Sequence, residues 1–117
     1  MRTVIAGSRT FNSLSQLCEA VAASGFVISE VVSGGARGAD RLGETWATLN
    51  KIPCARFLPD WTTHGKAAGI IRNKEMAAYA EALIALWDGQ SRGTKNMIEE
   101  ARKRGLKVYV HKDVYSV

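Results

Sequence analysis

The sequence predicts an α/β fold in which a mainly parallel sheet of about five strands is flanked by helices. Short apolar runs alternate along the chain with segments whose apolar residues recur at helical spacing. The segment Ala82–Trp87 is apolar throughout, as expected for a strand buried on both faces of a parallel sheet. Glycine-containing turns follow several of these runs, where a strand gives way to a helix.

The first part of the chain reads as a strand, a turn and a helix. Thr3–Ala6 is predicted to be a buried strand, and Gly7-Ser8-Arg9 is its exit turn. Ser13 and Gln16 have the spacing of a capping box, in which each residue caps the start of a helix. Gly25 is expected to end that helix.

A second unit follows the same plan. The pattern predicts a strand over Val27–Val32, a glycine turn over Ser33–Asp40 and then a helix. The apolar face of this helix carries Leu42, Trp46 and Leu49. Pro53–Leu58 is predicted to be a third, short strand.

The rest of the chain completes the alternation. Pro59–Lys66 is predicted to be a polar loop, and a helix is expected from Gly69. After the strand Ala82–Trp87, a second glycine-containing turn, Asp88–Thr94, leads to a helix that ends at Gly105. Leu106–Val110 is the last predicted strand.

Composition limits the possible classes of protein. A chain of 117 residues, of which 46% are hydrophobic, has the size of one domain, so residues 1–117 are expected to form a single domain. Its net charge of +5 favours anionic partners. Cys18 and Cys54 stand apart from each other and from histidine, which indicates neither a metal site nor a disulfide. Without a signal-peptide pattern or a membrane-length apolar run, the protein is expected to be cytoplasmic and away from membranes.

The turns that follow the strands are the candidate site. Parallel strands place their carboxyl ends at one edge of the sheet, where ligands bind in open α/β folds. The turn Ser33–Asp40 would expose backbone N–H groups at a helix start and cradle a phosphate, or it would serve packing alone. The residues at these turns that would line the rim are Gly7, Ser8, Arg9, Gly34, Gly35, Arg37, Gly38, Asp40, Trp61 and Thr94.

Each polar candidate has two interpretations. Arg9, Arg37, Arg72 and Arg92 would pair with phosphate oxygens, or they are solvated surface arginines. Asp40 would accept a hydrogen bond from a ribose hydroxyl, or it caps or begins the next helix and favours its dipole. Ser8 and Thr94 would donate to phosphate, or they serve as turn and cap hydroxyls. Trp61, in the polar loop, is a candidate for stacking on a base.

Taken together, the motifs resemble those of the SLOG superfamily, and more narrowly its YspA/YpsA-related branch in bacteria and phages. The similarity covers nearly the whole chain. It is carried by Gly7-Ser8-Arg9, Ser33–Asp40, Asp60-Trp61, Gly65-Lys66, Ala68-Gly69, Arg72-Asn73, Met76, Trp87-Asp88-Gly89 and Ser91–Thr94. It implies a Rossmann-like fold, self-association into a homo-oligomer, and no required cofactor. The implied partner is a nucleotide or an ADP-ribose- or NAD-derived molecule, which the protein would sense, sequester or process. The resemblance also adds Asn73 and Gly93 to the site.

Two better understood relatives suggest alternatives. In the LOG phosphoribohydrolases an arginine and a glutamate serve hydrolysis of nucleoside monophosphates. Arg72 resembles that arginine and would be catalytic in an enzyme, and Gly93-Thr94 matches the accompanying turn. Met97 stands at the expected glutamate position, so hydrolysis by that mechanism is not expected. The DNA-processing protein A family shares several of these motifs and binds single-stranded DNA, which makes nucleic acid the other alternative.

Overall fold

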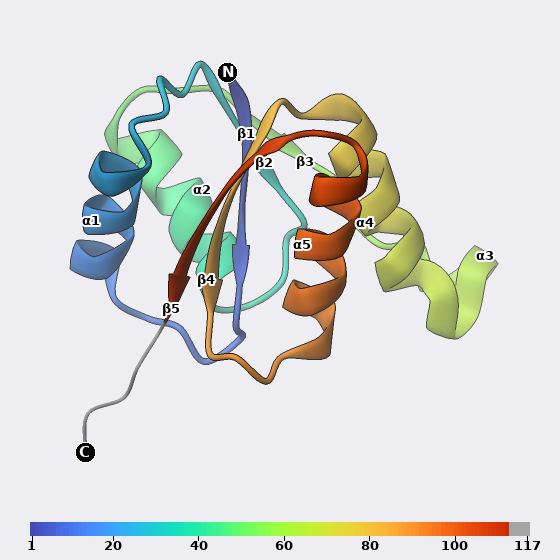
Figure 1. Ribbon diagram of the computed structural model, residues 1–117. Coiled ribbons are helices and arrows are strands. Elements are labelled where there is room, and N and C mark those ends of the chain that lie inside the picture. Colours follow the sequence, from blue (N-terminus) through green and yellow to red (C-terminus); the bar gives the residue numbers. More distant parts are fainter. Residues whose placement is uncertain (113–117) are drawn as a thin grey trace.

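The computed structural model describes residues 1–112. Five strands form one parallel sheet in the order β3-β2-β1-β4-β5 (Figure 1). The strands are β1 (Arg2–Gly7), β2 (Glu30–Ser33), β3 (Cys54–Arg56), β4 (Ala82–Trp87) and β5 (Lys107–Lys112). The helices are α1 (Leu14–Ser24), α2 (Ala39–Leu49), α3 (Trp61–His64), α4 (Ala68–Tyr79) and α5 (Arg92–Lys103), with a 3-10 turn, η1, at Gly65–Ala67. The predicted α/β fold is therefore confirmed.

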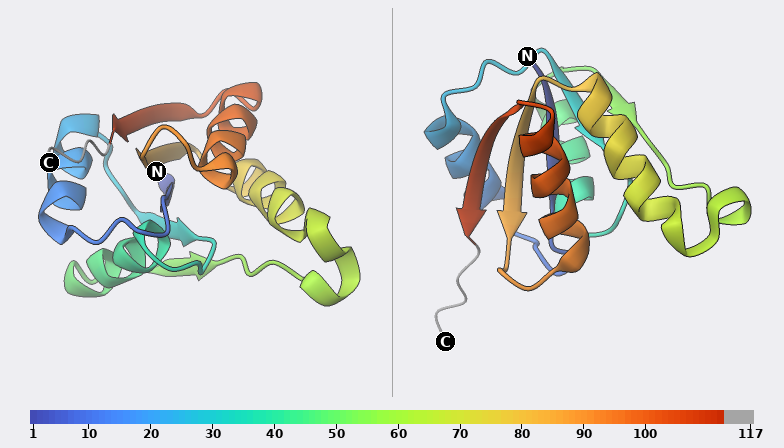
Figure 2. Two further views of the ribbon diagram at one scale, coloured as in Figure 1. Left: turned by 90° about the horizontal axis from the view of Figure 1, so that it is seen from below. Right: turned by 45° about the vertical axis from the view of Figure 1, so that its right-hand side comes forward.

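Helices cover both faces of the sheet, with α1 and α2 on one side and α4 and α5 on the other (Figures 1 and 2). Neighbouring strand residues point to opposite faces. Ile84 therefore packs with the α1 and α2 residues Leu17 and Trp46, whereas Leu83 packs with Met76 of α4 and Ile98 of α5. Burial on both faces explains why β4 is apolar from end to end. Within residues 1–112, each helix is too short or too polar to cross a bilayer.

The first helix starts where the sequence predicts, with one difference. The Ser13 hydroxyl accepts the Gln16 backbone N–H at 3.2 Å, and Gly25 ends the helix in a left-handed conformation. The Gln16 side chain does not complete the capping box, because its Oε1 contacts Nε2 of His111 at 3.2 Å. This contact ties the start of α1 to β5 instead.

The second strand is shorter than the predicted Val27–Val32. Val27 is 80% exposed, and its carbonyl accepts a hydrogen bond from the Met1 ammonium group at 2.7 Å. Ladder pairing with β1 begins only at Glu30, opposite Arg2. The preceding segment contributes Phe26 and Ile28 to the packing beside α1 and α2, which explains its apolar character without strand pairing.

Other boundaries also differ. The predicted third strand pairs only over Cys54–Arg56. The predicted polar loop Pro59–Lys66 contains the short helix α3, because the Asp60 carboxylate accepts the Thr63 N–H at 3.0 Å and caps it. The α2 helix begins at Ala39, inside the predicted glycine turn.

The strand order creates a switch point between β1 and β4. From β1 the chain proceeds to β2 on one side, while β4 and β5 lie on the other. The loop after β1 therefore leads to α1 on one face, and the loop after β4 leads to α5 on the opposite face (Figure 1). Loops that diverge in this way open a crevice at the carboxyl ends of the strands.

Candidate functional site

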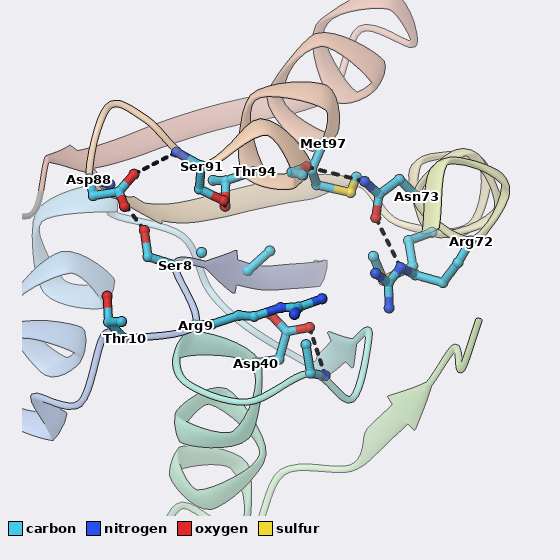
Figure 3. A pocket seen from close by; sticks show the side chains of 15 residues that line it. Ser8, Arg9, Thr10, Asp40, Arg72, Asn73, Asp88, Ser91, Thr94 and Met97 are labelled. Atoms are coloured by element: carbon cyan, nitrogen blue, oxygen red, sulfur yellow. Dashed lines mark hydrogen bonds between the residues drawn. The ribbon is translucent and has the colours of Figure 1, made fainter. Parts of the chain in front are cut away.

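A cavity of about 400 Å³ occupies this crevice and is called here the switch-point pocket. The loops after β1, β2 and β4 line it, together with the inward faces of α4 and α5 (Figure 3). The structure thus brings together side chains from distant parts of the sequence. The predicted site residues that line this pocket are Gly7, Ser8, Arg9, Asp40, Arg72, Asn73, Gly93 and Thr94.

Asp40 is the buried carboxyl group of the pocket, with a relative exposure of 5%. Burial raises its pKa from 3.8 to about 6, although the Ala36 N–H and the positive charge of Arg72 both favour the ionised form. Its Oδ2 accepts the Ala36 N–H at 3.2 Å. Asp40 lies in the first turn of α2 but is not its N-cap, which is Gly38. The carboxyl group therefore closes the glycine turn and faces the pocket.

Arg72 is half-buried on α4 and crosses to the glycine turn. Its Nη1 donates to the Gly34 carbonyl at 2.6 Å, and its Nε donates to Asn73 Oδ1 at 3.0 Å. Burial lowers the pKa of Arg72, and the nearby charge of Arg9 lowers it further, while Asp40 opposes both effects. An arginine stays protonated under such shifts. Two guanidinium groups therefore share the pocket, which favours an anion.

Arg9 extends across the pocket from the β1 loop toward Arg72, whose pKa its charge lowers (Figure 3). The side chain is exposed. No side chain of residues 1–112 forms an ion pair or hydrogen bond with its guanidinium group. Arg9 is thus a cation at the pocket whose hydrogen-bonding capacity is unused by the described protein.

Two glycines of the turn permit close contacts within the protein. Gly38 has φ +78°, and a Cβ there would lie 2.3 Å from the Ser8 carbonyl oxygen. A Cβ on Gly34 would lie 2.5 Å from Nη1 of Arg72. The Ala39 N–H also donates to the Ser8 carbonyl at 3.2 Å, which fixes the glycine turn against the β1 loop. A side chain at either position would therefore collide with groups of the protein itself.

Ser8 joins the loops after β1 and β4. Its hydroxyl oxygen accepts the Asp88 N–H at 3.1 Å, and the hydroxyl also contacts the Asp88 carboxylate. Asp88 accepts the N–H groups of Ser91 and Gln90 at 2.7 and 2.8 Å, and these bonds lower its pKa. The Ser8 hydroxyl therefore joins these two loops at the edge of the pocket.

The N-terminus of α5 forms the opposite wall. A helix leaves its first N–H groups without intrahelical acceptors. A Cβ on Gly93 would meet nothing within 4 Å, so a ligand can approach the backbone closely here. The Thr94 hydroxyl lies 3.1 Å from the Ser91 hydroxyl, while Asn73 holds the wall by donating to the Gly93 carbonyl at 3.3 Å. Ser91, not Thr94, occupies the N-cap position.

The remaining predicted residues lie outside this pocket. Gly35, Arg37 and Trp61 line an adjoining cavity, together with Gly34. Their predicted placement at the carboxyl edge of the sheet holds, but they form a second hollow. Among residues 1–112, no group of three or more His, Cys, Asp or Glu side chains is arranged to bind a metal ion.

Two contributors had no predicted side-chain role. Asp88 was expected only as part of the turn Asp88–Thr94, and its carboxylate both lines the pocket and organises the β4 exit. Arg41 lines the adjoining cavity. Its position in the first turn of a helix gave no indication of the direction in which its side chain points.

Comparisons with known proteins agree with this geometry. Residues 1–64 match the model of the YspA, cpYpsA-related SLOG family (YAcAr). The Gene 61 protein of Mycobacterium phage D29 is 37% identical over 119 residues, covering 92% of this chain and 93% of the phage protein.

A solved structure shares the fold. The DNA processing protein A (DprA) from Streptococcus pneumoniae superposes with a TM-score of 0.75 at 16% identity, over 93% of this chain. The chain spans about half the length of that protein, 49%. On the sequence matches, with the fold in agreement, the chain belongs to the YspA, cpYpsA-related SLOG family.

Proposed function

We propose that the protein binds a nucleotide or a nucleotide-derived small molecule in the switch-point pocket, and that it senses, sequesters or processes this ligand. The observation that carries the proposal is the convergence of Arg9 and Arg72 on a cavity at the carboxyl edge of the sheet. Phosphate binds there between the two guanidinium groups and the N-terminus of α5. Asp40 offers a carboxylate oxygen to a ribose hydroxyl.

Isothermal titration calorimetry with AMP, ADP, ADP-ribose and NAD tests this proposal. Arg9→Ala removes a guanidinium group that no hydrogen bond or ion pair holds within residues 1–112, so the variant should fold normally. It should weaken binding by about tenfold or more, as expected for a lost charge-assisted hydrogen bond. Arg104→Ala is the matched control, because it removes the same charge from an exposed position at the end of α5. The proposal fails if no nucleotide binds or if both variants behave alike.

Single-stranded DNA is the second candidate ligand. The net charge of +5 and the exposed indole of Trp61 favour it, and the fold is shared with a DNA processing protein. The two candidates differ in their salt dependence. Binding to DNA releases counterions from many phosphates, so the affinity falls steeply as the salt concentration rises. One nucleotide in a pocket makes few phosphate contacts, so its affinity falls less. Binding of a labelled oligonucleotide and of a nucleotide over a salt series separates them.

The pocket has no carboxylate at the position where a glutamate would serve hydrolysis of a nucleoside monophosphate. Met97 is buried and lines the pocket there. A thioether neither transfers a proton nor stabilises a developing positive charge as a carboxylate does. The acidic side chains that line the pocket, Asp40 and Asp88, lie on α2 and in the loop after β4 and do not stand at the Met97 position on α5. Binding without base release is therefore the proposed behaviour toward nucleoside monophosphates.

A further inference from the structure

A second cavity of about 390 Å³ adjoins the switch-point pocket. It is called here the arginine cavity, and it shares Arg9, Ala36 and Arg72 with the first as lining residues. Its other walls come from the glycine turn, from Arg41 of α2 and from the segment that leads to α3. The two cavities therefore form neighbouring compartments along the edge of the sheet, with two arginines at their common boundary.

All the charged residues that line the arginine cavity are positively charged. Arg9, Arg37, Arg41 and Arg72 line it, and no acidic residue does. Within residues 1–112, none of these four guanidinium groups is within 4.0 Å of a carboxylate oxygen. The neighbouring Arg56, by contrast, pairs with Glu44 at 3.3 Å. These like charges repel one another, although Asp40 offsets part of the charge of Arg72. An anion with several phosphate groups would relieve the remaining repulsion.

The outer end of the arginine cavity carries an aromatic surface. Trp61 is 55% exposed and lies on α3, which projects from the body of the protein beyond α4 (Figures 1 and 2). Leu58, also on the cavity wall, is 58% exposed. An exposed indole beside unpaired arginines is a suitable platform for a base. Trp61 is also the only aromatic residue that lines either cavity in the described part of the chain.

We propose that the ligand has two nucleoside units joined by phosphates and spans both cavities. This inference rests on the proposed function of the switch-point pocket. One nucleoside occupies that pocket, the bridging phosphates lie against Arg9 and Arg72, and the second base stacks on Trp61. Arg37 and Arg41 neutralise the phosphates from the outer side. The single aromatic platform favours this small ligand over a single strand of DNA, because proteins that bind single strands stack successive bases on several aromatic side chains.

Calorimetry with matched ligand pairs tests the inference. AMP, GMP, CMP and UMP are compared with the corresponding symmetrical dinucleoside diphosphates. At least one dinucleotide should bind about tenfold or more tightly than its mononucleotide, since one added stacked base alone supplies that factor. The Arg37→Ala/Arg41→Ala double variant and Trp61→Ala should each remove most of this advantage and leave mononucleotide affinity nearly unchanged. Trp61→Phe retains an aromatic face and should preserve much of it, and Arg104→Ala is the charge control.

The outcomes separate this inference from the proposed function. Equal affinity for the two members of every pair, or a dinucleotide advantage that survives all three variants, overturns the two-unit ligand and leaves the nucleotide site standing. Failure of every mononucleotide and dinucleotide to bind overturns both. A short single-stranded oligonucleotide that binds more tightly than any dinucleotide, with a steep salt dependence, also contradicts the inference. Circular dichroism of each variant confirms that the fold is retained.

Discussion

Replacing Asp40 by asparagine tests the electrostatics of the switch-point pocket in the free protein. The Asp40 side chain is 5% exposed, and burial raises its pKa from 3.8 to about 6. Asparagine has nearly the same shape and retains an oxygen that can accept the Ala36 N–H, the bond that Asp40 makes at 3.2 Å. The substitution therefore removes the ionisation while it keeps the geometry of the turn.

The magnitude follows from the shift in pKa. A carboxyl group whose pKa is higher in the folded protein binds its proton more tightly there, so its contribution to stability is greatest below the unfolded pKa of 3.8. This contribution is lost as the pH rises through about 6, where the folded protein must hold a buried carboxylate. A shift of roughly two units corresponds to about 3 kcal/mol. Asp40 thus opposes the usual trend, in which carboxyl groups stabilise the folded state as the pH rises.

Urea unfolding of the wild type and of Asp40→Asn, from about pH 4 to about pH 8, measures this effect. The difference in unfolding free energy between the two proteins should change by roughly 2 to 3 kcal/mol across the range, in favour of the asparagine variant at high pH. Titrating groups that do not interact with Asp40 contribute equally to both proteins and cancel. Parallel curves for the two proteins would refute the conclusion that burial, and not the Arg72 charge, dominates at Asp40.

Three further predictions concern the turn, the first helix and the chemistry. Gly38→Ala should lower the free energy of unfolding by more than Gly25→Ala does. Both residues have a positive φ (78° and 70°), but only a Cβ on Gly38 would meet backbone, at 2.3 Å. Equal losses of stability in thermal unfolding would contradict this prediction. Ser13→Ala should cost about 1 kcal/mol and lower the Tm by about 4 °C, through loss of the N-cap bond, whereas an unchanged Tm would show that the cap contributes nothing. The wild-type protein should release no free base from nucleoside monophosphates in a chromatographic assay, because Met97 replaces the needed carboxylate; clear turnover would disprove that reasoning.

The order of the elements could be predicted because the signals are local. Apolar runs, the Ser13 cap and Gly25 mark boundaries through interactions within a few residues, and the structure retains them. The predicted boundaries were wrong where contacts between residues far apart in the sequence determine the end of a strand. Val27 was predicted to lie in a strand, but the Met1 ammonium group and the late start of pairing at Glu30 keep it outside the ladder.

The candidate site followed from one topological rule, that parallel strands place their exits at one edge. It predicts that the turns after β1, β2 and β4 lie together, and in the structure they line one pocket. It did not reveal what each side chain does there. Asn73 uses its amide to hold Arg72 and the Gly93 carbonyl, and the pKa of Asp40 depends on burial by segments far away in the sequence. Arg72 crosses from α4 to Gly34 and lines both cavities, a placement that no local pattern encodes.

The claim that a nucleotide binds between the loops after β1 and β4 is tested most directly by amide chemical shifts. Two-dimensional ¹H–¹⁵N spectra of the labelled protein are recorded with increasing amounts of the nucleotide that binds most tightly in calorimetry. The backbone amides of Ser8, Arg9, Gly93 and Thr94 should shift together and saturate at the calorimetric affinity, since these residues line the switch-point pocket. Shifts confined to the exposed outer surface of α5, around Glu99 and Arg102, or the absence of any shift, would contradict the claim.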